Sequence, residues 1–274
     1  RDRSPSRGLG DVYKRQMKKY ILLLAITLVS VHTWAQENRT KTLINAALHG
    51  WEYELKAGFN IGGTLPLPFP EEIRNIKSYN PTLSITIEGN MTKWLGEQKR
   101  WGVVTGLRLE NKGMRTKAEV KNYGMEIIGE DGNRLKGNWT GGVRTKVQNS
   151  YLTIPILAAY KLNQRVNLKA GAYFSYLMDG DFSGHVYEGY LRKDDPTGEK
   201  VNFNNGAIAS YDFSSDLRNF QWGAQLGVDW KAFKHLKVYA DLNWGMNDIF
   251  NKDFKTITFD MYAVYLNVGF GYAF

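Results

Sequence analysis

The sequence predicts an all-β fold, an eight-stranded antiparallel up-and-down transmembrane β-barrel preceded by a cleavable signal peptide. Three observations predict this fold. Eight stretches alternate between apolar and polar residues, their connections alternate between short and long, and the last stretch keeps one unbroken apolar face up to Phe274. Alternation at period two marks a strand with one face in an apolar medium. About 9 to 11 tilted residues suffice to cross a bilayer within a barrel.

Composition agrees with a barrel and excludes several other classes. The 274 residues include 28 Gly and no Cys, and the mean hydropathy is -0.42. A helical membrane protein would have a strongly positive value, because each span needs about 20 mostly apolar residues. A barrel strand alternates apolar with polar positions, so its mean hydropathy stays low. The lack of Cys excludes a disulfide scaffold and a Cys-based zinc site.

The N-terminal region predicts export. Residues 17–35 combine two lysines, an apolar run and a small-residue end, which is typical of a signal peptide cleaved after Ala35. The alternative is a membrane anchor, but the apolar run from Tyr20 to Val31 is shorter than the roughly 18 residues of a span. Residues 1–16 precede a good start Met and are interpreted as a non-native tail. Residues 36–50 then form a short periplasmic segment before a barrel over residues 51–274.

Charge gives no reason to expect a nucleic-acid partner. Residues 1–36 hold seven Lys/Arg and two Asp/Glu, so their removal lowers the net charge from +9 to +4. No basic cluster with stacking aromatic residues remains in the mature chain.

The eight predicted strands follow one another from residue 51. They are residues 51–64, 81–91, 100–113, 150–162, 165–178, 220–230, 236–246 and 262–274. In that order, the first seven apolar faces include Trp51, Leu55 and Phe59; Leu83, Ile85 and Ile87; Trp101, Val103 and Leu107; Leu152, Ile154 and Ile156; Val166, Leu168 and Phe174; Phe220, Trp222 and Leu226; and Leu236, Val238 and Leu242. Polar and small residues occupy the opposite faces.

The connections predict which strand ends share a side of the membrane. Short connections at 93–99, 163–165 and 232–234 alternate with long ones at about 65–80, 114–148, 181–217 and 249–258. Outer-membrane barrels have short periplasmic turns and long extracellular loops, so both termini are expected in the periplasm. Within the second long connection, Asp131–Gly132 predicts a hairpin that continues the strands. A soluble sandwich or lipocalin-like barrel would show the same alternation, but the signal peptide, the aromatic residues at strand ends and the loop asymmetry favour the membrane.

The last strand resembles the C-terminal signal by which outer-membrane barrels are recognised for insertion. Its apolar face consists of Tyr262, Val264, Leu266, Val268, Phe270, Tyr272 and Phe274. The resemblance implies the barrel-assembly machinery as a partner, and the apolar face implies contact with outer-membrane lipid.

The chain as a whole resembles the PorT-like, porin-family outer-membrane β-barrel proteins of Bacteroidetes. The resemblance covers most of residues 49–274 and is clearest in "NKGM" at 111–114 and "YLTIP" at 151–155. It implies an integral protein of the Gram-negative outer membrane more than it implies an activity. Members have been linked to type IX secretion.

The polar face predicts a charged lumen. An eight-stranded barrel is just filled by its own side chains. The expected inward charges are Lys56, Glu88, Arg108, Glu110, Lys169, Asp229, Lys237 and Asp241. A turn centred on Phe233 would place Asp229 opposite Lys237, where cross-strand charges pair. These residues are interpreted as a structural network that fills the barrel, and the alternative is a path for protons or ions.

Catalysis is not expected. The mature chain has three histidines, His49, His185 and His235, and only His185 has a serine and an acid nearby, Ser183 and Asp181. A triad needs such a set in a fixed geometry, and a solvated loop is the preferred interpretation. No metal-ligand spacing or cofactor fingerprint is present.

The predicted function is therefore non-enzymatic. The filled lumen and long loops favour surface interaction with an unknown protein or glycan partner, an envelope-structural role or a secretion-accessory role. The alternative is a small porin-type channel. Aromatic residues of the third long connection, Tyr187, Tyr190, Tyr211 and Phe213, would mark a partner site or pack the loops on one another.

Overall fold

The computed structural model describes residues 50–128 and 134–274. The predicted upstream tail, the signal peptide and almost all of the N-terminal segment lie outside the described residues, as does the Asp131–Gly132 turn. In the part of the chain that is described, no helix is both long and apolar enough to span a membrane.

The described chain consists of ten strands and one short helix. The strands are β1 (Trp51–Pro66), β2 (Ile73–Pro81), β3 (Ser84–Leu95), β4 (Trp101–Ile128), β5 (Arg134–Lys161), β6 (Val166–Lys193), β7 (Lys200–Asp212), β8 (Phe220–Lys231), β9 (Leu236–Gly245) and β10 (Met261–Ala273), and a 3-10 helix, η2, covers Ser214–Asp216.

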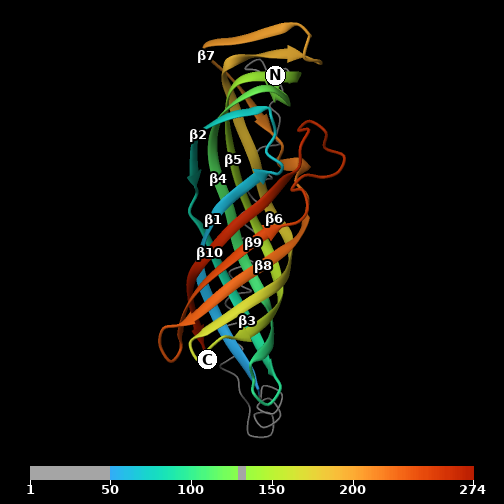
Figure 1. The fold of residues 1–274 in the computed structure, drawn as a ribbon. Helices are drawn as coiled ribbons and strands as arrows, with labels where there is room; N and C mark the ends of the chain where they lie inside the picture. Colours follow the sequence, from blue (N-terminus) through green and yellow to red (C-terminus); the bar gives the residue numbers. More distant parts are fainter. Residues whose placement is uncertain (1–49, 129–133) are drawn as a thin grey trace, which may run out of the picture. The chain divides into compact units, whose positions relative to one another are not determined.

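Eight of these strands form a closed antiparallel ring in the order β1, β3, β4, β5, β6, β8, β9 and β10 (Figure 1). The ring closes where β10 pairs with β1, for example at Asn60 and Asn267. Each of the eight predicted strands lies within or overlaps one strand of this ring, so the predicted up-and-down eight-stranded barrel is confirmed. Closure removes the sheet edges of the ring except beside residues 61–66 of β1, which β3 does not reach, and a hydrocarbon environment favours such closure.

The two faces of the ring are as the alternation predicts. In β1, Leu55, Phe59 and Ile61 are exposed, whereas Lys56 and Asn60 are buried inside. A soluble barrel of this sequence would bury the apolar face. The opposite orientation, with the apolar face outward and the charges inward, is the one that lipid requires.

Three strands continue well past the ring and form a strand extension, which comprises residues 111–128 of β4, 134–150 of β5 and 178–193 of β6 together with β2 and β7. The connections predicted at 114–148 and 181–217 are therefore not irregular loops, because β4, β5 and β6 are each 28 residues long. β4 and β5 stay paired as far as Ile128 and Arg134, as a continuing hairpin predicts. β2 pairs with β4, and β7 pairs with β6. Both lie at the end of the barrel away from the C-terminus (Figure 1).

The interior changes character along the barrel. Inside the ring it is polar and charged, whereas inside the strand extension it is a hydrophobic core around Trp139, Val147, Phe182 and Phe250. The sequence switches accordingly, because inward positions of β4 change from Arg108 and Glu110 to Met114, Val120 and Met125 as the strand leaves the ring.

Candidate functional site

All eight charges predicted to face the lumen are buried in it. Their exposed fractions do not exceed 5%. The prediction missed two further buried charges, Glu54 and Lys112. Glu54 lies on the same face of β1 as Lys56, and Lys112 lies on the same face of β4 as Arg108. Extending each inward face by two residues would have found both. Among the described residues the lumen thus buries five basic and five acidic side chains, so their formal charges cancel.

The centre of the lumen is a four-membered charge cluster. The Lys169 ammonium lies 2.7 Å from Asp229 and 2.9 Å from Asp241. Lys56 lies 3.5 Å from Asp229 and 3.4 Å from Asp241. Each lysine thus contacts both carboxylates. A buried charge is tolerable only when it is paired, and all four groups have an oppositely charged partner here. Asp241 Oδ2 also accepts hydrogen bonds from Lys56 at 3.4 Å and Lys169 at 3.3 Å.

Arg108 holds the next layer together. Its Nε donates to a Glu88 carboxylate oxygen, and its two terminal nitrogens donate to Gln225 Oε1 at 2.8 Å and Asn243 Oδ1 at 3.2 Å. The fixed fork of donors on a guanidinium suits such a site, where β3, β8 and β9 each supply one acceptor to the arginine on β4.

A third layer lies next to the strand extension. Glu110 accepts from Thr153 at 2.8 Å and pairs with Lys112 at 3.0 Å. The Lys112 ammonium also faces the rings of Tyr151, Tyr173 and Tyr265 at 5.1 to 5.8 Å. These three tyrosines are themselves buried. Tyr265 also belongs to the hydrophobic core of the strand extension.

The predicted pairing of Asp229 with Lys237 is wrong. The β8–β9 register places Asp229 opposite Tyr239 and Lys237 opposite Lys231. The turn is therefore centred on Lys234 and not on Phe233, and this shift of one residue moves every cross-strand partner by two positions. Lys237 instead contacts Glu52 and, at 3.4 Å, Glu54.

A basic cleft of about 1020 Å³ lies on the outer face of the strand extension, over β2, β4, β5, β6 and β7. Two cross-strand rows form its floor. One row runs through Lys117, Arg144 and His185, and the other through Arg115, Lys146 and Ser183. Four cations therefore lie directly opposite one another in two like-charged pairs, which is an unfavourable arrangement on a sheet.

The cations of this cleft are only partly compensated. Lys146 contacts Asp181, and Asp212 lines the cleft at its β7 side. Among the described residues, the structure shows no carboxylate paired with Arg115, Lys117 or Arg144. Burial and the neighbouring Arg144 guanidinium lower the pKa of His185 below its ordinary value. The cations without a paired carboxylate give the cleft a positive potential.

The residues considered for catalysis do not form a triad. The Ser183 hydroxyl donates to Asp181 at 2.6 Å, whereas a triad needs the histidine between the serine and the acid. The His185 ring instead lies against the Tyr187 ring. His235 contacts the Ala273 carbonyl through Nδ1, and His49 lies outside the described residues.

The remaining residues that the sequence analysis named lie partly on the outer face of the barrel and partly in its interior. The predicted insertion-signal residues of β10 point outward, as does Phe274 directly after the strand, and their exposure reaches 61% at Phe270 and 75% at Phe274. Their recognition by assembly machinery stays a prediction. Of the four aromatic residues of the third connection, Tyr211 and Phe213 are buried in the hydrophobic core, so they do not mark a surface.

The family model of the outer membrane protein beta-barrel domain matches residues 34–251. The chain belongs to this family. It is therefore an integral β-barrel of the outer membrane, as the outward apolar face already indicates. No curated protein matches the chain.

Several solved outer-membrane barrels are similar to this one at low identity. Ail, the attachment invasion locus protein of Yersinia pestis, is 12% identical with a TM-score of 0.35, over 81% of this chain and 98% of Ail. OprG from Pseudomonas aeruginosa is 12% identical with a TM-score of 0.31, over 81% and 95%. The outer membrane protease OmpT from Escherichia coli is 11% identical with a TM-score of 0.29, over 82% and 97%. Such low values carry no conclusion about activity.

Proposed function

We propose that this outer-membrane barrel is a non-enzymatic surface-binding protein that is closed to flow and binds an anionic saccharide in the basic cleft. The lumen supports the proposal that the barrel is closed to flow. Its charges are paired with one another in the layers described above, and the hydrophobic core lies beyond them. The short turns would face the periplasm, together with both termini, and the strand extension would face the exterior.

The observation that carries the proposal is the block of four opposed cations. Lys117 faces Arg144 and Arg115 faces Lys146 across β4 and β5. Like charges directly opposite one another destabilise a sheet, and a bound polyanion would remove this repulsion. Exposed guanidinium and ammonium groups pair well with phosphate and sulfate oxygens.

The groups around the cations favour a saccharide as the ligand. Ser78, Ser183 and Ser210 line the cleft beside the basic side chains. Hydroxyl groups can donate to and accept from sugar hydroxyls, while the cations bind phosphate or sulfate substituents. A phosphorylated or sulfated saccharide satisfies both sets of groups.

Binding of dextran sulfate, with neutral dextran as the comparison, tests the proposal. The refolded barrel is expected to bind dextran sulfate and not neutral dextran, with an affinity that falls as salt rises, because exposed ion pairs are screened. The double substitution K117Q/R144Q should weaken binding by about 1–2 kcal/mol, taken as roughly 0.5–1 kcal/mol for each exposed charge.

The matched control removes two charges elsewhere. Lys252 and Lys255 are exposed and lie outside the cleft lining. K252Q/K255Q changes the net charge by the same amount and should leave binding nearly unchanged. Equal losses in the two double variants would show that binding follows net charge and not the cleft.

A further inference from the structure

A seam interrupts the barrel wall where β3 begins. β1 pairs with β3 only as far as Asn60 and Ser84, and the rest of β1 pairs with β10 alone in the described chain. At this level β2 lies nearby but pairs with β4. No ladder of backbone hydrogen bonds therefore joins residues 61–66 of β1 to β2.

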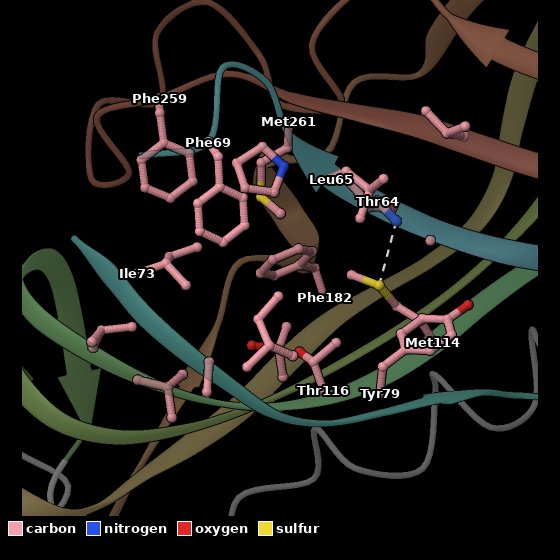
Figure 2. A pocket seen from close by; sticks show the side chains of 18 of the residues that line it. Thr64, Leu65, Phe69, Ile73, Tyr79, Met114, Thr116, Phe182, Phe259 and Met261 are labelled. Carbon is pink, nitrogen blue, oxygen red and sulfur yellow. Dashed lines mark hydrogen bonds between the residues drawn. The ribbon is translucent and has the colours of Figure 1, made fainter. Parts of the chain in front are cut away.

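Two side chains replace the missing ladder. The Tyr79 hydroxyl of β2 donates to the Gly62 carbonyl at 2.6 Å. The Thr64 amide donates to Met114 Sδ at 3.4 Å, as the dashed line in Figure 2 shows. A thioether is a weak acceptor. The seam is thus held by one good hydrogen bond and one weak one, where a continuous wall would have a full set.

An apolar cavity of about 360 Å³ lies behind the seam. Leu65, Phe69, Ile73, Phe182, Phe259 and Met261 surround it (Figure 2). None of the described residues that line it is charged. Ligand pockets typically have volumes of roughly 300 to 1,000 Å³ and mostly apolar walls with few polar groups, and this cavity fits that description for a small or slender apolar ligand.

The cavity runs from the surface to the interior. Phe69, Ile76 and Tyr79 line it and are 44% to 55% exposed, whereas Met114 and Phe182 line it and are buried. The adjacent outward residues, Ile61 of β1 and Leu266 of β10, face each other in register on the lipid-facing surface. The cavity mouth is thus continuous with the surface that meets lipid.

We propose that this cavity binds one acyl chain of a membrane lipid, which enters sideways through the seam between β1 and β2. Continuity with the lipid-facing surface decides the occupant, because an apolar chain can pass from the bilayer into the cavity without crossing water. The uncharged lining suits a chain and leaves the polar headgroup outside. This site adjoins the basic cleft, with which it shares Tyr79, Thr116 and Thr145, but the cleft differs in having a charged lining.

Photolabelling in vesicles tests the proposal. The full barrel is reconstituted in phosphatidylcholine that carries a diazirine on one acyl chain, illuminated, and mapped by peptide mass spectrometry. Met114 and Phe182 face inward, so lipid outside the wall cannot reach them. The expected result is label on these two residues in addition to the lipid-facing ones.

A blocking variant and a matched control make the result specific. A Cβ on Gly63 would lie 2.8 Å from Met114 Sδ, at the end of a flexible side chain, so Gly63→Phe fills the cavity. Gly89 is exposed on β3, and a Cβ there meets nothing within 4 Å, so Gly89→Phe adds the same ring outside the cavity. Label on Met114 and Phe182 should fall to the level of an unilluminated sample in the first variant and persist in the second.

Folding is checked by heat-modifiable mobility on semi-native gels. If Gly63→Phe fails to fold, Ala118→Phe blocks the cavity from β4, because Ala118 also lines it. Inward residues that remain unlabelled in the unmodified barrel would overturn the proposal. Undiminished label in a folded blocking variant would overturn it as well.

Discussion

At the scale of single residues, the lumen shows what a barrel interior requires of a buried charge. Lys56 and Lys169 each contact both Asp229 and Asp241, and Arg108 contacts three acceptors from three other strands. Taking a charge out of water costs several kcal/mol unless a partner offsets it. Each of these charges therefore depends on neighbours that are far away in sequence.

Removal of one carboxylate should expose this dependence. Asp229→Ala leaves two buried lysines facing one remaining acid, so we expect a loss of about 3 to 5 kcal/mol in the free energy of unfolding. Asp229→Ala combined with Lys169→Ala should cost less than the sum of the single changes, because the two side chains lie 2.7 Å apart. Urea unfolding in lipid vesicles measures the free energy of unfolding of the two single variants and the double variant.

Lys237 supplies the control for this cycle. It contacts Glu52 and Glu54, and the structure shows no ion pair between it and Asp229. The losses in the free energy of unfolding caused by Asp229→Ala and Lys237→Ala should therefore add up more nearly than those caused by Asp229→Ala and Lys169→Ala. A larger coupling with Lys237 would mean that the register of β8 and β9 is the one centred on Phe233.

At the scale of elements, the residues of the long strand β4 change where the strand leaves the membrane. Outward positions of β4 are apolar at Leu107 and Leu109 and basic at Arg115 and Lys117. A strand needs about 9 to 11 residues to cross a bilayer, so most of this 28-residue strand lies outside the hydrocarbon region. Its inward positions change from charged to apolar at nearly the same place.

The last strand allows a test of depth on a single face. Val268 lies midway along the outward face of β10, and Tyr262 lies near its end. Val268→Lys should destabilise the folded barrel by about 2 to 4 kcal/mol and Tyr262→Lys by about 0 to 1, because the cost of a lysine falls from the bilayer midplane toward the interface. Equal costs in unfolding experiments from vesicles would contradict a lipid-facing β10.

The sequence was informative wherever alternation alone decides the structure. It predicts the eight strands of the ring and the inward face that carries Lys56, Arg108 and Asp241, since a period of two depends only on neighbouring residues. It misplaces the partner of Asp229, because a cross-strand contact depends on the exact centre of a turn. Neither the apolar cavity nor the basic cleft follows from any one stretch, because each depends on β2 pairing beside β4.

At the scale of the whole molecule, closure and filling act together. The ring removes unpaired edges from the lipid, apart from the seam beside β2. Three layers of paired charges fill the lumen, and the hydrophobic core of the strand extension continues the filling. The proposed function therefore predicts that no continuous aqueous path runs through the described part of the barrel, and that ligands bind in the basic cleft and the apolar cavity instead.

Single-channel recording in a planar bilayer tests this central claim most directly. The purified barrel, inserted in parallel with a known porin that verifies detection, is expected to give no steady conductance while it remains folded. Steady, ion-selective openings of the unmodified protein would contradict the filled lumen and would favour porin-type transport instead.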